Sequence, residues 1–340
     1  MNTTKKSTTS LMRTTFRNFK KIPRTNTKNL SPRPYNTATL SSIRNKRSTS
    51  PRRNPDLRAQ IKLHKPGQPI RPVANNRNAP AYNISKLLLK KLNNLLNSQN
   101  HYIVKDSTAL ANDLKLKIDE NHRMITFDIK DLYVNIPIQE TLRTAKNLLL
   151  EKNNEHTSEQ IITLLEVTLQ QNYFLFCNNI YQPEKDVSMG SHISNIVAEI
   201  FLQELENTHL KQILDAQNFT FYARYVDDIL LIYNTKHTTP EIIHSHINKV
   251  HPKLQFTPTF ENNNNISFLD LLIIRHLTQV EIDIFRKPTT DTTINYTSNH
   301  PTEHNLAVYR YLINRMLSLP LSTERRITVW QKNANHSKQQ

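Results

Sequence analysis

The chain has 340 residues, and its 45 lysine and arginine residues outnumber 28 acidic residues, which gives a formal net charge of +17 at pH 7. A single cysteine excludes an internal disulfide, and no apolar stretch approaches the ~20 residues that a membrane-spanning helix needs, so we expect a soluble protein with no membrane partner. Only two glycines occur, which excludes the glycine-rich phosphate loops of Walker and dinucleotide-binding proteins.

The positive charge is concentrated at the N-terminus, where the first 60 residues hold 15 basic residues and one acid, Asp56. Residues 1–58 are rich in Ser, Thr, Asn, Pro, Lys and Arg with little hydrophobic periodicity, which predicts a disordered basic tail. Clusters such as IRNKRSTSPRRNP (43–55) suit phosphate backbones or a nuclear import receptor, and a transit peptide is the alternative. We therefore expect an intracellular protein, nuclear or cytoplasmic, and leave mitochondrial targeting open.

The ordered part of the chain is expected to begin near residue 57. Proline and glycine break the segment 61–76 into two short extended pieces, which predicts a basic hairpin or loop. Helical periodicity predicts helices over 83–97, 137–152, 157–171, 192–214, 240–250 and 304–319. Strand patterns predict a strand over 123–129, hairpins over 173–182 and 221–234, and strands over 254–260, 266–275 and 280–286. This order predicts an α+β fold with helices packed on one side of a sheet, followed by a polar tail.

Two adjacent acids, Asp227 and Asp228, interrupt the apolar run FYARYVDDILLIYN (221–234). Like charges in a buried strand pair repel each other and lose hydration, so they need either a balancing cation or a solvated turn. Asp128 ends the earlier strand RMITFDI (123–129). If the two strands are neighbours in one sheet, three carboxylates meet at one edge and suit two Mg²⁺ ions roughly 3.5–4 Å apart. The alternative is an Asp-Asp turn in solvent with Asp128 at an unrelated strand end.

Several segments resemble reverse transcriptases, and they occur in the family's order. YVDD (225–228) resembles the catalytic signature, and FDIKDLYVNIP (127–137) resembles the first palm motif. The motif that contacts template and nucleotide is matched by VSMGSHISNIVAEIFLQELE (187–206), and the fingers segment that grips the triphosphate by KLHKPGQPIRPV (62–73). Three further segments resemble the palm end and thumb of Penelope-like retroelements: FLDLLI (268–273), IFRKPTTD (284–291) and SNHPTEHNLAVYRYLINR (298–315).

The resemblance implies an RNA-directed DNA polymerase with a right-hand fold and an antiparallel palm sheet. The implied parts are fingers over 59–122 and 138–184, a palm over 123–137 and 185–283, and a partial thumb with the polar tail over 284–340. The implied partners are an RNA template, a DNA primer and dNTPs, and the implied cofactor is a pair of Mg²⁺ ions that Mn²⁺ can replace. The oligomeric state is left open.

The resemblance also implies roles for individual residues. Asp128 and Asp227 would bind the metals, and Asp228 would add charge and orient the primer end. Tyr133 matches the aromatic steric gate that excludes a ribose 2′-OH, with an ordinary core tyrosine as the alternative. Lys65, Arg71 and Asp131 would line the triphosphate pocket. Met189 and Gly190 would form the floor under the nascent base pair, and Lys287 would contact the duplex.

The chain departs from the family pattern at a few positions. His192 and Asn195 stand where the family usually has proline, and Asp186 replaces a glycine. The GIY-YIG endonuclease common in Penelope-like elements is not found in the sequence, which predicts an endonuclease-lacking type or a truncated element. These departures leave a second interpretation open, a catalytically decayed or domesticated nucleic-acid-binding protein that keeps the fold. A viral-type RNA-directed RNA polymerase is disfavoured by the large side chain at Tyr133.

Overall fold

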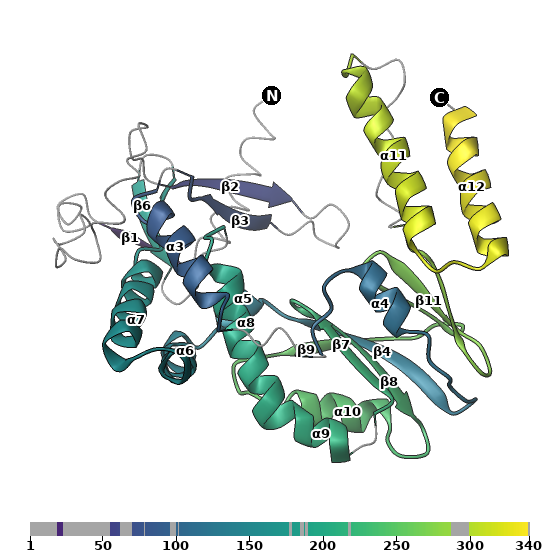
Figure 1. The fold of residues 1–340 in the computed structure, drawn as a ribbon, viewed down its shortest axis with the longest axis horizontal. Coiled ribbons are helices and arrows are strands. Elements are labelled where there is room, and N and C mark those ends of the chain that lie inside the picture. The colour runs from purple at the N-terminus through teal and green to yellow at the C-terminus, as the bar shows by residue number, and fades with distance from the viewer. Residues whose placement is uncertain are drawn as a thin grey trace. The chain divides into compact units, whose positions relative to one another are not determined.

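The computed structural model describes residues 19–22, 55–61, 70–77, 79–95, 100, 102–176, 179–183, 187, 190–216, 219–286 and 299–338 (Figure 1). The chain divides into two compact units, and each unit draws on two separate stretches of chain. Unit 1 comprises Met1–Ser98 and Asp131–Asn207, and unit 2 comprises Gln99–Lys130 and Thr208–Gln340. No helix in the described ranges is long and apolar enough to cross a bilayer.

Unit 1 contains a five-stranded sheet in the order β1-β6-β5-β2-β3. Its strands are β1 (Phe19–Ile22), β2 (Asp56–Ile61), β3 (Ile70–Asn75), β5 (Phe174–Phe176) and β6 (Asn179–Pro183). Its strands pair in antiparallel fashion except for a short parallel pairing of β2 with β5. The hairpin predicted over 173–182 is confirmed as β5–β6. The segment 61–76, predicted as a hairpin or loop, contains β3 and only the last residue of β2, so the β2–β3 pair begins earlier in the chain than predicted. Within the predicted tail 1–58, β1 and the start of β2 are strands, and most of the rest lies outside the described residues.

The helices of unit 1 are amphipathic and bury their apolar faces. They are α3 (Tyr82–Leu92), α5 (Leu132–Asn135), α6 (Ile138–Lys152), α7 (Glu155–Gln170) and α8 (Ser194–Leu205). Helix α7 begins where the Asn154 side chain accepts a hydrogen bond from the Thr157 amide, an N-cap that satisfies one of the free donors of the first turn. The predicted helix over 192–214 is α8 followed by a π-helical turn, η3 (Glu206–Leu210), and α9 (Lys211–Ala216).

Unit 2 contains a four-stranded antiparallel sheet in the order β7-β8-β4-β9. Its strands are β4 (His122–Ile129), β7 (Phe221–Tyr225), β8 (Asp228–Asn234) and β9 (Phe256–Phe260). Helix α10 (Pro240–Ile247) packs on this sheet, and the ring of its His244 stacks on Phe127 of β4 with 6.3 Å between ring centroids. Helix α10 begins where Thr239 caps the amide of Ile242 and proline occupies the first turn.

A second sheet of unit 2 has the order β10-β11-β12. Its strands are β10 (Asn265–Phe268), β11 (Leu271–Arg275) and β12 (Val280–Ile284). Besides α9 and α10, the helices of unit 2 are α4 (Ser107–Asp113), α11 (Thr302–Ser318) and α12 (Thr323–Lys338). Helices α11 and α12 lie side by side (Figure 1). One hydrophobic cluster joins both sheets to α4, α11 and α12, with members such as Leu110, Met124, Leu230, Ile273, Met316 and Val329.

Two predictions for the C-terminal half are wrong. The single strand predicted over 266–275 is a hairpin of β10 and β11, because Leu269 adopts a left-handed backbone (φ 57°) and turns the chain. The predicted polar tail contains α12, which is held by tertiary ion pairs rather than by an apolar stripe alone. Arg325 of α12 lies 3.2 Å from a carboxylate oxygen of Asp283 and 3.4 Å from one of Glu281.

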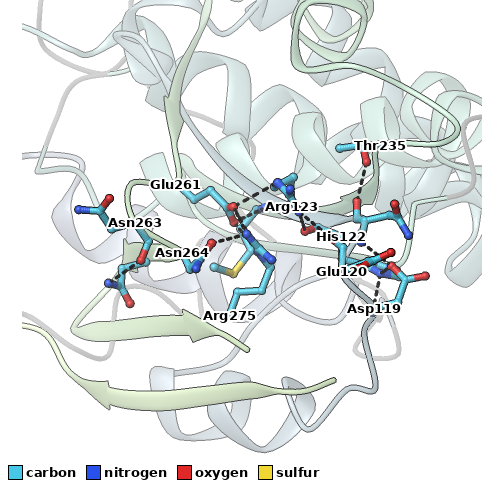
Figure 2. Close-up of polar contacts among 12 residues, drawn as sticks. Asp119, Glu120, His122, Arg123, Thr235, Glu261, Asn263, Asn264 and Arg275 are labelled. Atoms are coloured by element: carbon cyan, nitrogen blue, oxygen red, sulfur yellow. Dashed lines mark hydrogen bonds and ion pairs between the residues drawn. The ribbon is translucent and has the colours of Figure 1, made fainter. Parts of the chain in front are cut away.

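The two sheets of unit 2 are linked by the carboxylate of Glu261, which follows β9. Figure 2 shows this carboxylate between Arg123 of β4 and Arg275 of β11. Arg275 donates to both of its oxygens, with the shortest contact at 2.7 Å, and the Met124 amide donates to Oε2 at 3.0 Å. The Glu261 and Arg275 side chains are only 12% and 8% exposed, so each charge depends on the other for its compensation.

We predict that Glu261→Ala lowers the free energy of unfolding by about 3–5 kcal/mol, because it leaves a buried guanidinium without its partner. Urea denaturation of the full chain measures the change. Glu120→Ala, which removes an exposed carboxylate near the same strand, serves as the matched control and is expected to stay within about 0.5 kcal/mol of the unchanged protein. Equal effects of the two substitutions would show that Glu261 does not link the sheets.

Candidate active site

The central feature of unit 2 is the pairing of β4 with β8, which places Asp128 directly opposite Asp228. The amide of Ile129 donates to the carbonyl of Asp227 at 2.9 Å, so the flanking residues make the ladder bond and the two acids form a non-hydrogen-bonded pair. In such a pair the Cα atoms are only about 4.5 Å apart and the side chains are close neighbours. The sheet therefore brings the backbones of Asp128, Asp227 and Asp228 together at one end of two adjacent strands.

The turn between β7 and β8 holds its residues in an uncommon conformation. Val226 has a φ of 56°, and it is the only β-branched residue with a positive φ among the described residues. A left-handed backbone costs an L-residue with a Cβ about 1–2 kcal/mol, so the surrounding structure has to hold it in place. All three acids are half-buried, which limits how far water can screen their mutual repulsion.

Arg224 is a site residue that the sequence reasoning passed over. It lies in the middle of β7 and is 1% exposed, which makes it the largest fully buried side chain in the described part of the chain. Its Nη1 donates to the carbonyl oxygen of Val226 at 3.2 Å. The signal that could have found it is plain in FYARYVDD, where one cation stands between apolar residues just before the acid pair.

The three carboxylates are the type of donor that Mg²⁺ prefers, and their backbones converge. Their side chains do not yet form a metal cage: no group of three or more His, Cys, Asp or Glu side chains in the described ranges is arranged to hold an ion. Mg²⁺ usually keeps several waters and binds one or two carboxylates together with substrate phosphates. The residues therefore fit a site that is completed by substrate, and the metal roles of Asp128, Asp227 and Asp228 stay predictions.

The structure explains why residue 190 is a glycine. Its φ is +104°, and a Cβ built on it would lie 2.3 Å from the backbone oxygen of Ala74 in β3. The sequence led us to expect that backbone must approach something closely here. Within unit 1 that neighbour is the β2–β3 hairpin, and contact of Gly190 with a nascent base pair stays a prediction.

Tyr133, the predicted steric gate, is half-buried in α5 and is fixed at both ends. Its hydroxyl donates to the Oδ1 atom of Asn195 in α8 at 2.7 Å, and its carbonyl accepts from the Val187 amide at 3.3 Å. Asn195 stands where the family usually has proline, and a proline would offer no side-chain acceptor to the hydroxyl. This departure from the family pattern thus supplies a specific contact to the predicted gate.

The other predicted nucleotide contacts are only partly described. Asp131 is exposed and adopts a left-handed backbone (φ 50°) as the N-cap of α5. Arg71 lies in β3 opposite Gln60 of β2. Lys65, Met189 and Lys287 lie outside the described residues, so their predicted contacts stay predictions.

His192 lines a cavity of about 360 Å³ in unit 1 together with Gly190 and two exposed cations, Arg58 and Arg77. Its ring meets the edge of Tyr82 at 4.8 Å, and the ammonium of Lys86 lies 4.7 Å from the centre of the same tyrosine ring. Burial and, secondarily, the charge of Lys86 lower the pKa of His192 below its usual value. This shift favours the neutral imidazole, which presents one donor and one acceptor.

Comparison with known proteins places these features in a family. The family model described as Reverse transcriptase (RNA-dependent DNA polymerase) matches residues 63–256, more than half of the chain. No curated protein sequence matches the chain.

Among solved structures, telomerase from Candida albicans in complex with a TWJ fragment of telomeric RNA aligns with a TM-score of 0.62 and 12% identity, over 98% of this chain and 60% of that one. Apo telomerase from Candida tropicalis aligns with a TM-score of 0.55 and 13% identity, over 88% of this chain and 61% of that one. This chain therefore spans less than two thirds of either protein, and at this identity the likeness is one of fold.

The fold class predicted from the sequence is confirmed as a reverse-transcriptase-like polymerase fold of mixed α+β structure with antiparallel sheets.

We predict that Gly190→Ala lowers the free energy of unfolding by at least about 1–3 kcal/mol, because the new methyl group meets backbone in an unfavourable conformation. Chemical denaturation measures the loss, and faster amide hydrogen exchange in β3 is expected to accompany it. Ser191→Ala, one residue further on, is the control and should change stability by less than about 0.5 kcal/mol. A Gly190→Ala protein as stable as the control would mean that β3 does not lie against this residue.

Proposed function

The chain belongs to the reverse transcriptase family of RNA-directed DNA polymerases, and we propose that it extends a DNA primer on an RNA template by two-metal nucleotidyl transfer at Asp128, Asp227 and Asp228. The observation that carries the proposal is the register of β4 with β8, which sets Asp128 against the Asp227–Asp228 turn. As the finer assignment we propose a Penelope-like retroelement, supported by the resemblance of 268–273, 284–291 and 298–315.

In the proposed reaction the primer 3′-oxygen bonds to the α-phosphorus of a dNTP, the bond to the β-phosphate breaks, and pyrophosphate leaves as the 3′-hydroxyl loses its proton. Two Mg²⁺ ions, when bound, would supply the activation of the hydroxyl and the neutralisation of the leaving group. Asp128 and Asp227 would hold these ions, and Asp228 would add negative charge beside them. The chain's own contribution is to fix these carboxylates on rigid strands, since positioning supplies much of the rate in phosphoryl transfer.

The predicted fingers, palm and thumb ranges belong to this proposal. The division of the chain by contacts falls between residues 98 and 99, 130 and 131, and 207 and 208, and Asp128, Asp227 and Asp228 all lie in unit 2. Tyr133, Gly190 and the β2–β3 hairpin lie in unit 1. We propose that unit 1 supplies the nucleotide and template contacts, with the cavity beside Gly190 taking a template base.

A second candidate function is a nucleic-acid-binding protein that keeps the fold without catalysis. The departures at His192 and Asn195 favour it, because both positions lie in the motif that would contact template and nucleotide. It predicts binding to an RNA–DNA hybrid that weakens with salt and is not followed by extension.

Primer extension tests the proposed function directly. On poly(rA)/oligo(dT) with Mg²⁺ or Mn²⁺ we expect incorporation of dTMP that EDTA abolishes and that Asp227→Ala reduces at least about a thousandfold, since metal ions supply several kcal/mol of transition-state stabilisation. Asp113→Asn, which neutralises an exposed acid of α4, is the control and should retain activity.

Incorporation no greater than that of the Asp227→Ala protein would contradict the polymerase proposal. Retained, salt-sensitive hybrid binding in that case would support the second candidate.

The gate proposal makes a separate prediction about sugar selection. Tyr133→Ala should raise the kcat/KM for UTP relative to that for dTTP by about one to two orders of magnitude, because it removes the ring that would clash with the 2′-hydroxyl. Tyr133→Phe keeps the ring and loses the hydroxyl bond to Asn195, so it should change the ratio far less. An unchanged ratio in Tyr133→Ala would remove the gate role, and a native preference for ribonucleotides would favour an RNA polymerase.

A further inference from the structure

The two peptide groups on either side of Asp227 each accept a hydrogen bond through their carbonyl oxygen. The carbonyl of Val226, in the peptide that precedes Asp227, accepts a hydrogen bond from Arg224 Nη1 at 3.2 Å. The carbonyl of Asp227 itself, in the peptide that follows, accepts from the Ile129 amide of β4 at 2.9 Å. Because each peptide group is planar, fixing both carbonyls fixes the direction in which the Asp227 side chain leaves the backbone.

The guanidinium that makes the first of these bonds is costly to bury. Arg224 is 1% exposed and cannot lose its proton, so its charge is held inside the protein. Removing a charge from water costs several kcal/mol, and an apolar side chain would fill the same space without that cost, so packing alone does not explain an arginine here. The role of Arg224 is therefore to be found in the groups that accept hydrogen bonds from its guanidinium.

The backbone of Arg224 is itself held on both sides, which makes it a rigid base for that contact. In the β7–β8 ladder it is paired with Ile229. On its other edge its amide donates to the Tyr102 carbonyl at 2.7 Å, and its carbonyl accepts from the Val104 amide at 2.9 Å. With the Cα fixed in this way, the position of Nη1 depends on the side-chain rotamer alone.

The residue that receives the bond would not adopt its conformation unaided. Val226 has a φ of 56°, and left-handed backbone is strongly disfavoured for a β-branched side chain. Strain of this kind persists only where neighbouring structure over-determines it, and it concentrates at functional sites. The bond from Arg224 to the Val226 carbonyl is such a restraint, and it acts on the peptide that leads into Asp227.

We propose that Arg224 is a positioning residue for the carboxylate site: its buried guanidinium holds the strained Val226–Asp227 peptide, and this aims Asp227 toward Asp128. The inference rests on the proposed function for its catalytic consequence, but its structural part stands apart from it. Without the bond, Val226 would relax toward negative φ, and Asp227 and its bond to Ile129 would shift with it.

The experiment compares Arg224→Met, Arg224→Lys, Val226→Gly and the double variant Arg224→Met/Val226→Gly in the full chain. Arg224→Met is expected to lower kcat for primer extension about tenfold or more with little change in the KM for dTTP, because it misplaces a group that acts in the chemical step. Arg224→Lys, which keeps a donor but not the planar fork, should be intermediate. Glycine adopts positive φ without strain, so Val226→Gly should restore most of the loss in the double variant.

Hydrogen exchange gives a readout that does not depend on activity. In Arg224→Met the Ile129 amide, whose acceptor is the Asp227 carbonyl, should exchange about tenfold faster, while amides of β11 stay unchanged. Val226→Gly should return the Ile129 amide toward its original rate in the double variant. Arg326→Met removes an exposed arginine of α12 in the same unit and is the control, with kcat and Ile129 exchange expected to be unaffected.

The outcomes separate the two claims. An inactive native protein would defeat the proposed function, and Ile129 exchange would still test whether Arg224 holds the turn. Native kcat and native Ile129 exchange in Arg224→Met would overturn the inference. So would a general loss of stability that accelerates exchange in β11 as well and is not reversed by Val226→Gly, because that pattern belongs to a core residue without a positioning role.

Discussion

The pairing of β4 with β8 is the constraint on which the rest of the site depends. Side chains alternate along a strand, so a slip of one residue would place Asp128 on the opposite face from Asp228. The register is fixed by the apolar residues on either side of the acids: Ile125, Phe127, Ile229 and Leu231 are all at most 2% exposed. The burial of these apolar residues thus determines the position of the acids, although the acids repel each other there.

The carboxylates lie at an end of the sheet where the backbone departs from regular strand geometry. The chain leaves β7 through a strained valine, and a buried arginine and the neighbouring strand β4 both donate hydrogen bonds to the turn. In unit 1, likewise, Gly190 admits a close approach of β3 that no other residue allows, and Tyr133 is fixed by Asn195. Rigid placement of groups that would otherwise move is what a site for phosphoryl transfer needs.

Much of this fold could be predicted from the sequence because its signals are local. Alternating and helical apolar patterns predicted most of the strands and helices, and the isolated acids in apolar runs marked the site, whereas β1 lies within the segment that was predicted to be a disordered tail. The hairpin at Leu269 was missed because its turn, Leu269–Asp270, has neither glycine nor proline, and a leucine takes the left-handed backbone that glycine or asparagine usually supplies. Helix α12 was missed because part of what holds it, the ion pairs of Arg325 with Asp283 and Glu281, joins residues that are far apart in the sequence. Arg224 was overlooked because its role depends on a bond across the turn, which sequence spacing does not show.

The central claim is that Asp128 and Asp227 share a pair of divalent ions, and a crystal of the protein with primer–template, dNTP and Mn²⁺ tests it most directly. Anomalous scattering should show two manganese peaks roughly 3.5–4 Å apart, each within coordination distance of at least one of these carboxylates. A site with manganese elsewhere, or with nucleotide bound and no manganese at these residues, would contradict the account.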